Sequence, residues 1–239
     1  MTAAPVSVIR RGREKARVAP WRGHGSVALI TTLAEGPLLS VEFVQHCLEV
    51  LAGRGFSRVV TAALSPLEQA GFLAAGFDVQ EELRLLGLDL ASVPTVVPPG
   101  VRLVGVRRRR RAQVLRVDAS AFSEFWRFDN LALDDALRAT PYVRFRAAAP
   151  RFGPVQGYAI CGRAGRRGYV QRLAVDPQAQ GRGTGRRLLL DGLAWLVRQG
   201  ATRAFVNTQS SNEAALGLYL DVGFREEPVG LSVLSAGLA

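Results

Sequence analysis

The sequence predicts an α/β protein of the α+β type, in which a mixed and mostly antiparallel sheet is flanked by helices. Strand-like apolar runs alternate with helical patterns along most of the 239 residues. Segments 51–82 and 196–227 share one order of features: a helix end, a glycine, an arginine-containing strand, a short helix, Gly-Phe and a further strand. A proline-rich stretch over 91–100 separates the halves. We therefore expect a smaller unit over 1–93 and a larger one over 101–239.

The first half is expected to hold two helices between strands. Apolar residues recur at helical spacing over 41–51, and two glycines that follow supply a stop. Ser65 and Pro66 are residue types favoured at the cap and at the first position of a second, short helix. Residues 1–20 are basic with little periodicity, so we expect a partly ordered arm there. The expected strands cover 26–34, 57–63 and 82–90.

The second half is expected to combine hairpin strands with a crossover helix late in the chain. Its early strands have the short spacing of antiparallel hairpins. The expected strands cover 101–106, 142–149, 155–163, 169–175, 203–208 and 229–234. The expected helices cover 107–122, a segment ending near 199, and 211–223.

The composition indicates a globular chain with a substantial core. Hydrophobic residues make up 48% of it, and no apolar run approaches the ~20 residues that a membrane span needs. Cys47 and Cys161 are too few for a disulfide framework, so we expect two buried thiols and a cytoplasmic protein. His24 and His46 lie far from any second ligand at metal spacing, and no metal site is expected.

The formal net charge is +11, and Lys15 is the only lysine, so the basic residues are almost all arginines. Scattered arginines are typical of a genome that prefers arginine codons. The run from Arg107 to Arg111 is either a solvated helix face or a patch for nucleic acid. Because no aromatic residues are interleaved with it, we favour the solvated face.

The stretch LAVDPQAQGRGTGRRLLL, from Leu173 to Leu190, ends a strand in a loop of alternate glycines and then begins a helix. The first N–H groups of a helix lack intrahelical partners, and the helix dipole adds partial positive charge. Glycines let a ligand approach the backbone closely. We therefore expect an anion site, typical for phosphate. No P-loop lysine is present, and G-x-G-x-G departs from the dinucleotide-binding fingerprint.

With QGRGTG at 180–185, preceded by LAVDP, the chain resembles the GNAT superfamily of N-acetyltransferases, whose acetyl-CoA signature is Q/R-x-x-G-x-G/A. The segment NTQSSNEAALGLYLDVGF, residues 207–224, is similar to the superfamily's N-x-x-A-x-x-L-Y-x-x-x-G-F segment. The resemblance covers about 101–234 well and the first half as a degenerate repeat. It implies a GNAT fold and catalytic domain over 101–239, a degenerate GNAT-like unit over 1–93, and acetyl-CoA as the acetyl donor.

The resemblance also implies roles for particular residues. The backbone of Leu173, Ala174 and Val175 would pair with the acetyl and pantetheine amides. Asn212 would bond the pantetheine arm, and Tyr219 would protonate the departing thiolate. The ordinary tyrosine pKa of about 10 is close enough to that of a thiol for this role. The N–H groups of the glycine loop would cradle the pyrophosphate, which completes the donor-binding set with Gln180, Gly181, Arg182, Gly183, Thr184, Gly185 and Arg186.

The chain departs from the superfamily pattern at the general base. Relatives that acetylate protein N-termini carry a glutamate on the strand before the Asn–Tyr helix, where this chain has Asn207. The preceding strand offers Gln171 and Arg172, which are not carboxylates. A water relay, an amine that arrives neutral, or an acid outside these strands remain as alternatives.

The acceptor pocket of the superfamily is lined by the loop between the first two helices, here FSEFWRFDN. Glu124, Trp126 and Asp129 in this loop are therefore substrate-site candidates. The alternative is that the aromatic side chains pack in the core and the acids cap a helix, Asp129 especially. The run of residues alone does not decide between the two.

We predict a GNAT-family N-acetyltransferase that moves an acetyl group from acetyl-CoA to a primary amine by direct attack. The amine belongs to a small molecule, a protein N-terminus or a lysine. The alternative is a non-catalytic acyl-CoA-binding or regulatory module of the same fold, which the missing glutamate favours. We expect no membrane partner and no nucleic acid partner, and homodimerisation is left open.

Overall fold

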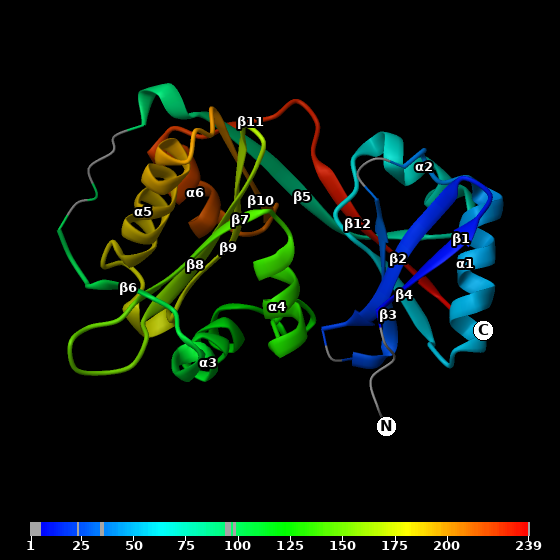
Figure 1. The fold of residues 1–239 in the computed structure, drawn as a ribbon, viewed down its shortest axis with the longest axis horizontal. Helices are drawn as coiled ribbons and strands as arrows, with labels where there is room; N and C mark the ends of the chain where they lie inside the picture. The colour runs from blue at the N-terminus through cyan, green and yellow to red at the C-terminus, as the bar shows by residue number, and fades with distance from the viewer. Residues whose placement is uncertain (1–5, 23, 34–35, 94–96, 98, 239) are drawn as a thin grey trace. The chain divides into compact units, whose positions relative to one another are not determined.

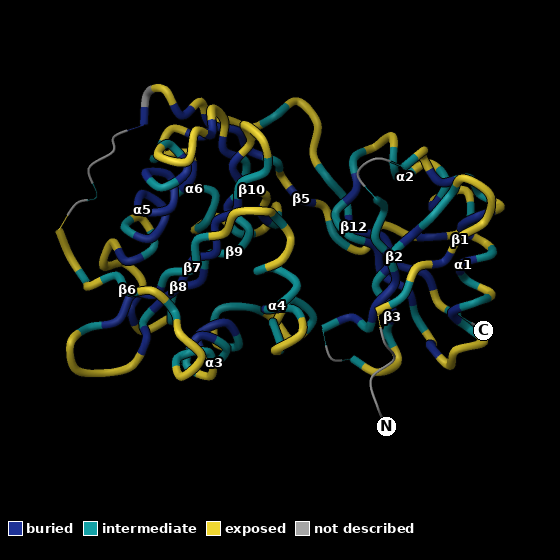
Figure 2. The backbone as a smooth tube through the Cα atoms, in the orientation of Figure 1, coloured by how far each residue is buried: buried dark blue, intermediate teal, exposed yellow. Residues whose placement is uncertain are grey.

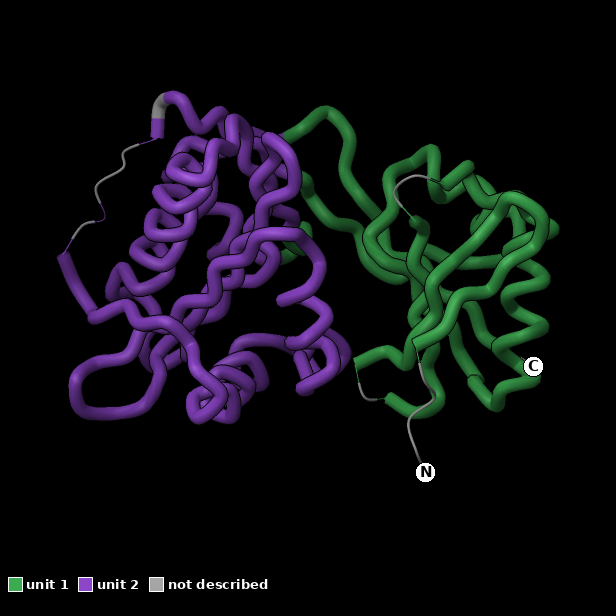
Figure 3. The backbone as a smooth tube through the Cα atoms, in the orientation of Figure 1, with its two compact units in different colours: residues 1–85, 208–211, 227–239 green, residues 86–207, 212–226 purple. Residues whose placement is uncertain are grey.

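The computed structural model describes residues 6–22, 24–33, 36–93, 97 and 99–238. The chain separates into two compact units (Figure 3). Unit 1 comprises residues 1–85, 208–211 and 227–239, and unit 2 comprises residues 86–207 and 212–226. The expected division into 1–93 and 101–239 follows chain order, whereas these units follow contacts, and it stays a prediction. Pro94 and Pro98 of the expected linker lie outside the described residues.

Unit 1 is a mixed sheet with two helices (Figure 1). Its strand order is β1-β2-β3-β4-β12-β5, in which β3 and β4 pair in parallel and the other neighbours pair antiparallel. Helix α1 connects the two parallel strands, as such a crossover requires. The elements are β1 Ser7–Arg11, β2 Glu14–Trp21, β3 His24–Thr32, α1 Val41–Gly53, β4 Arg58–Thr61, α2 Pro66–Ala74, β5 Asp78–Asp89 and β12 Leu231–Gly237.

The partly ordered arm expected at the N-terminus is wrong for residues 7–20, which form most of a β-hairpin. Strands β1 and β2 pair from Ser7 opposite Val18 to Arg11 opposite Glu14, and Gly12 turns the chain at φ 61°. Ile9 is buried against the unit 1 core. Arginines on the outward positions dilute the apolar signal, which explains why the alternation was weak in the sequence. Residues 1–5 lie outside the described part of the chain.

The strands of unit 2 continue the same strand order from β5 as a mixed and mostly antiparallel arrangement, as the sequence predicts. Their order is β5-β10-β9-β8-β7-β6, and β11 pairs with β5. Strands β10 and β9 pair in parallel, and the strands from β9 to β6 pair antiparallel. The strands are β6 Leu103–Gly105, β7 Tyr142–Ala148, β8 Gly157–Ala164, β9 Arg167–Val175, β10 Arg203–Gln209 and β11 Arg225–Glu226.

Helices cover both faces of the unit 2 sheet (Figure 1). Leu189 and Leu193 of α5 pack with Tyr219 of α6 on one face. Val114 of α3 and Leu133 of α4 pack against Tyr158 of β8 on the other. Figure 2 shows α5 as largely buried. The helices are α3 Arg111–Ala121, α4 Asn130–Arg138, α5 Thr184–Arg198 and α6 Glu213–Val222, with short 3₁₀ turns η1 Leu90–Ser92, η2 Arg108–Arg110, η3 Glu124–Trp126 and η4 Pro177–Ala179.

The repeat seen in the sequence has a matching local geometry in each unit. In unit 1, the rings of Phe72 and Phe77 meet edge-on at 5.2 Å, and the N–H of Phe77 donates to the carbonyl of Phe72 at 3.1 Å. In unit 2, the rings of Tyr219 and Phe224 lie 5.7 Å apart, and the N–H of Phe224 donates to the carbonyl of Tyr219 at 3.0 Å. The expected cap and first position of the short helix, Ser65 and Pro66, are confirmed.

Helix α5 approaches β8 so closely that one of its positions must be glycine. A Cβ atom added to Gly192 would lie 2.4 Å from the sulfur of Cys161, which is fully buried in β8. By contrast, a Cβ atom added to Gly217 of α6 meets nothing within 4 Å. A Cβ atom is therefore excluded at Gly192, whereas Gly217 has room for one.

Gly192→Ala should lower the free energy of unfolding by about 1–3 kcal/mol, because the new methyl group overpacks the interface between α5 and β8. Gly217→Ala should instead leave stability unchanged or raise it by up to about 1 kcal/mol, since alanine is the better helix former. Urea denaturation of both variants measures the difference. The double variant Gly192→Ala/Cys161→Ala should recover most of the loss, and no recovery would contradict the sulfur contact as its cause.

Candidate functional site

The central feature of unit 2 is the divergence of β9 and β10. Their parallel pairing begins with Arg203 opposite Arg167 and ends with Phe205 opposite Tyr169. β9 nevertheless continues to Val175 and β10 to Gln209. Beyond Tyr169, the described part of β9 is paired only with β8, so its other edge is open for a ligand.

A β-bulge accompanies the divergence. Ile160 lies opposite Arg172 and Cys161 opposite Val170, so Gln171 of β9 has no opposite residue on β8. Bulges bend a strand and increase its twist. The bend falls just after the last pair between β9 and β10, and it therefore offers a local cause for their separation.

The glycine loop leads directly into α5. Gly181 and Gly183 have φ values of 71° and 76°, which lie in the left-handed region that favours glycine. Gly183 is the N-cap of α5, where no side chain caps the first turn and no acidic residue stands in it. The free N–H groups of this turn and the helix dipole together favour an anion.

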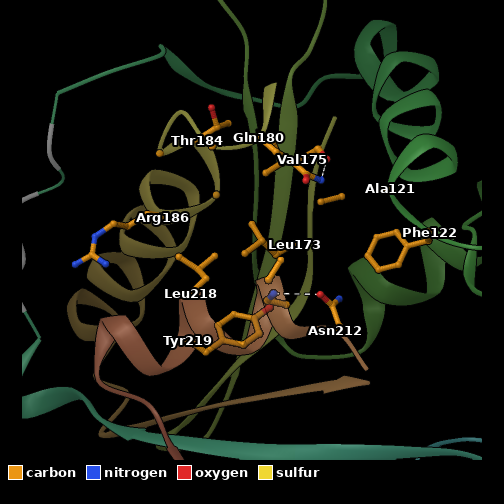
Figure 4. Close-up of a pocket in the computed structure, with 16 residues that line it drawn as sticks. Ala121, Phe122, Leu173, Val175, Gln180, Thr184, Arg186, Asn212, Leu218 and Tyr219 are labelled. Atoms are coloured by element: carbon orange, nitrogen blue, oxygen red, sulfur yellow. Dashed lines mark hydrogen bonds between the residues drawn. The ribbon is translucent and has the colours of Figure 1, made fainter. Parts of the chain in front are cut away.

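A pocket of about 330 Å³ opens where the loop, β9 and α6 meet. Its wall includes every donor-site residue predicted from the sequence except Arg182, which is exposed outside it. Figure 4 shows side chains of β9, α5, α6 and the end of α3 around one space. The lining residues are Ala121, Phe122, Leu173, Ala174, Val175, Gln180, Gly181, Gly183, Thr184, Gly185, Arg186, Asn212, Ala214, Ala215, Leu218 and Tyr219.

Asn212 has a structural duty as well as a place in the pocket. It is the N-cap of α6, and its Oδ1 accepts a hydrogen bond from the N–H of Ala215 at 3.1 Å (Figure 4). That bond occupies the side-chain oxygen and leaves the Nδ2 amide as the group that can donate to a ligand.

Tyr219 lies on α6 and is 5% exposed. Burial raises the pKa of its phenol well above the ordinary value, Cys161 raises it further, and Arg172 opposes the shift. The hydroxyl therefore keeps its proton across the physiological range. A tyrosine in this state can donate a proton but does not act as a phenolate.

The three acceptor-site candidates do not line the pocket. Asp129 is the N-cap of α4, and its Oδ1 accepts from the N–H of Ala132 at 2.7 Å. Glu124 is exposed at the start of η3. Trp126 is half-buried and packs edge-on against Phe125. Their role toward an acceptor stays a prediction.

A buried ion pair fixes the loop that holds these candidates. Asp118 of α3 is fully buried and forms a two-bond salt bridge with Arg172 of β9, at 2.8 Å to Nε and 3.0 Å to Nη2. The guanidinium also donates to the carbonyl of Trp126 at 2.7 Å and lies between the rings of Phe122 and Phe128, 3.4 Å and 4.1 Å from their centres. Arg172 thus joins the sheet to both ends of the loop.

Two further groups complete the partners of Asp118. The N–H of Phe128 donates to Oδ1 at 2.6 Å, and the hydroxyl of Tyr158 donates to Oδ2. Burial raises the pKa of Tyr158 above its ordinary range, so this donor also keeps its proton. The sequence offered one signal for this network, because Asp118 follows Val114 and Val117 on the buried stripe of a helix.

Sequence reasoning also missed part of the pocket wall. Ala121 and Phe122 at the end of α3 line it without belonging to either motif. No Asp, Glu or His lies among the described lining residues. Asn207 is exposed on β10, and Gln171 approaches Thr140 instead, so neither supplies a base.

The described residues contain no group of three or more His, Cys, Asp or Glu side chains that could hold a metal ion. No described helix combines the length and the apolar character needed to cross a membrane.

The sequence profile of the Acetyltransferase (GNAT) family matches residues 113–224. These residues include most of α3, the diverging strands, the glycine loop and α6. The chain therefore contains a domain of the Acetyltransferase (GNAT) family over these residues.

Relatives with curated names support the assignment. The chain is 43% identical over 196 residues to a mycothiol acetyltransferase of Amycolatopsis mediterranei, which covers 75% of this chain and 65% of that protein. It is 42% identical over 97 residues to the N-alpha-acetyltransferase RimI of Mycobacterium tuberculosis, which covers 39% of this chain and 58% of that protein. The chain thus spans less than two thirds of either relative.

Among solved structures, the chain is similar to a tandem GNAT protein from the clavulanic acid biosynthesis pathway. The TM-score is 0.70 at 15% identity, and the match covers 97% of this chain and 82% of that one. At this identity the likeness concerns the fold. It extends over both halves of the chain, in agreement with the expected tandem organisation.

Asp118→Leu should lower the free energy of unfolding by about 3–5 kcal/mol, because it leaves the Arg172 guanidinium buried without its counter-charge. The double variant Asp118→Leu/Arg172→Met should recover much of this loss. Urea denaturation of both variants and of Arg172→Met tests the coupling. A double variant whose loss is the sum of the two single losses would contradict it.

A matched control is the ion pair between Arg111 and Asp134, whose side chains are 30% and 31% exposed. Arg111→Met should cost about 1 kcal/mol or less, since solvent weakens an exposed pair.

Proposed function

We propose that the protein transfers an acetyl group from acetyl-CoA to a primary amine by direct attack of the amine on the thioester. The observation that carries the proposal is the open edge of β9, which faces the pocket. The same pocket is lined by the uncapped start of α5 and by Tyr219 of α6. The helix start suits the pyrophosphate, and the open strand suits the amides of the pantetheine arm.

The residues of the pocket divide the chemistry between them. The amine forms a bond to the carbonyl carbon, the bond between carbon and sulfur breaks, the amine nitrogen loses one proton to water, and the departing sulfur gains one. Tyr219 is suited to give a proton to the departing sulfur, because burial keeps its hydroxyl protonated. Figure 4 shows Tyr219 directed toward Leu173 on the open strand, the side from which the thioester would be held.

The missing carboxylate favours a second candidate function, a non-catalytic acyl-CoA-binding module. The described pocket wall has no Asp, Glu or His to take the proton of the amine. In the enzyme, an amine that arrives neutral or a water relay would replace that base. Both the acetyltransferase and the binding module would bind acetyl-CoA, but only the acetyltransferase would transfer its acetyl group to an amine.

The acceptor class is a primary amine of a small molecule or of a polypeptide. The relatives named above provide the two members to test first, a mycothiol-type amine and a peptide N-terminus. These acceptors belong to the relatives and serve here to define a substrate panel.

Gly183→Val should abolish the stabilisation of the protein by acetyl-CoA, because the side chain blocks the helix start and strains a left-handed position. For the wild type, acetyl-CoA at 100 times its dissociation constant should raise the free energy of unfolding by about 2.7 kcal/mol. Gly165→Val is the control, since Gly165 is also left-handed, at φ 55°, but lies in the β8–β9 turn. If thermal unfolding shows equal ligand stabilisation for both variants, the loop is not the donor site.

Tyr219→Phe should lower kcat by about 100-fold or more while leaving acetyl-CoA stabilisation unchanged, because it removes a proton donor and keeps the ring. The measurement is release of free thiol from acetyl-CoA against the amine panel. Unchanged kcat in the variant would remove Tyr219 from the chemistry. Acetyl-CoA binding without turnover of any amine by wild type would favour the binding module.

We expect kcat to rise with pH as the amine loses its proton. At pH values up to about 10, ionisation of Tyr219 should cause no decrease in kcat. The sign follows from burial, which raises the pKa of Tyr219 above the ordinary value of about 10 and so retains the acid. A descending limb near neutral pH that disappears in Tyr219→Phe would contradict this.

A further inference from the structure

A second pocket lies in unit 2, and it shares no lining residue with the pocket of about 330 Å³ proposed above to bind acetyl-CoA, which we call the donor pocket. The second pocket has a volume of about 630 Å³, and it is formed by β6, the residues on either side of β6, and residues 145–146 of β7. Five of its ten lining residues are arginines: Arg102, Arg107, Arg109, Arg110 and Arg146. None of the described lining residues is acidic. We call it the arginine pocket.

The sequence run Arg107 to Arg111 is therefore not a uniform solvated face. Three of its members line the arginine pocket, whereas Arg108 does not, and Arg111 pairs with Asp134 at 2.6 Å. The run stands at the start of α3, whose N-cap, Arg110, makes no side-chain capping bond. The unfilled first turn adds to the positive potential of the side chains.

Arg146 anchors the other wall. Its Nη2 donates to the carbonyl of Leu103 at 3.0 Å, which holds the side chain against β6. Its Nε is buried without a hydrogen-bond partner and lies 3.5 Å from Asp191. Asp191 is already engaged by Arg144 through two hydrogen bonds, at 2.8 Å and 2.9 Å.

The local charges are thus unbalanced. One carboxylate serves two arginines at the edge of the sheet, and the four other arginines of the pocket make no ion pair within the described chain. Like charges gathered in a concave site repel one another and focus a positive potential. A bound anion would relieve this repulsion.

We propose that the arginine pocket binds a phosphate-bearing small molecule at a site separate from the donor pocket. Guanidinium groups match phosphate oxygens with two parallel hydrogen bonds, which makes arginine the preferred residue for such ligands. The pocket volume falls in the range of small-molecule sites, roughly 300–1,000 Å³.

A small molecule fits this site better than a nucleic acid strand does. Single-stranded nucleic acid is bound by stacking of its bases on aromatic side chains. Phe145 is the aromatic residue among the described lining residues, and it packs inward against Tyr158 at 6.0 Å. No stacking platform is therefore offered to a chain of bases.

The test is calorimetric titration of the protein with inorganic tripolyphosphate in the presence of saturating CoA, which fills the donor site. Wild type should bind tripolyphosphate, and Arg109→Gln should weaken binding about 10-fold or more, as expected for loss of a charge-assisted hydrogen bond. The matched control is Arg108→Gln, which removes the same charge from the adjacent position outside the pocket and should change binding less than about twofold.

A second variant keeps the test independent of the arginines. A Cβ atom added to Gly105 in the pocket wall meets nothing within 4 Å. Gly105→Asp should therefore place a carboxylate in the pocket and weaken tripolyphosphate binding, whereas the uncharged Gly105→Asn should do so much less.

Four results would overturn the proposal. Wild type that does not bind tripolyphosphate would remove the site. Equal weakening by Arg108→Gln and Arg109→Gln would indicate a general charge effect. Binding that is measured in a parallel titration without CoA, and that saturating CoA abolishes, would assign the arginines to the donor site. An oligonucleotide that binds more tightly than tripolyphosphate, with the same dependence on Arg109, would replace the small molecule by a nucleic acid.

Discussion

The parallel pairing of β9 and β10 stops at Tyr169 and Phe205, and the rest of unit 2 is arranged around that interruption. A bulge at Gln171 bends β9 at this point. The separation exposes one edge of β9, makes room for the glycine loop, and brings α6 near enough to complete a pocket. A sheet with full pairing at this position would use the same backbone groups in a ladder and leave no open strand edge beside the pocket.

Much of the wall of the pocket between β9, the glycine loop and α6 was predictable because its determinants are local. In the glycine loop, the glycines themselves permit the left-handed backbone that leads into the uncapped start of α5. In α6, Asn212 is a residue type favoured at a helix N-cap. The wall from the end of α3 was not predictable, because it depends on Arg172 reaching across to Asp118, 54 positions earlier. The N-terminal hairpin was missed for a different reason, since its outward arginines weaken the alternation on which a strand prediction depends.

The two repeats show what a small side-chain change can do on one backbone. Phe72 and Tyr219 occupy the same place in a helix that ends at a left-handed glycine, Gly76 or Gly223, and each ring packs against the following phenylalanine. The packing needs only the ring, so the hydroxyl of Tyr219 is surplus to stability. In unit 1 the ring alone remains at this position.

The burial of both cysteines, which at Cys161 includes the close contact with Gly192, has a practical consequence. Both cysteines of the chain are buried, and burial is the main cause that raises the pKa of Cys47 and of Cys161 to about 12. Since the thiolate is the reactive form, alkylating reagents find almost no target in the folded protein. A fluorophore could therefore be attached to a single cysteine introduced at exposed Phe152 without removing the native ones. Labelling at a single site therefore needs one added cysteine and no other substitution.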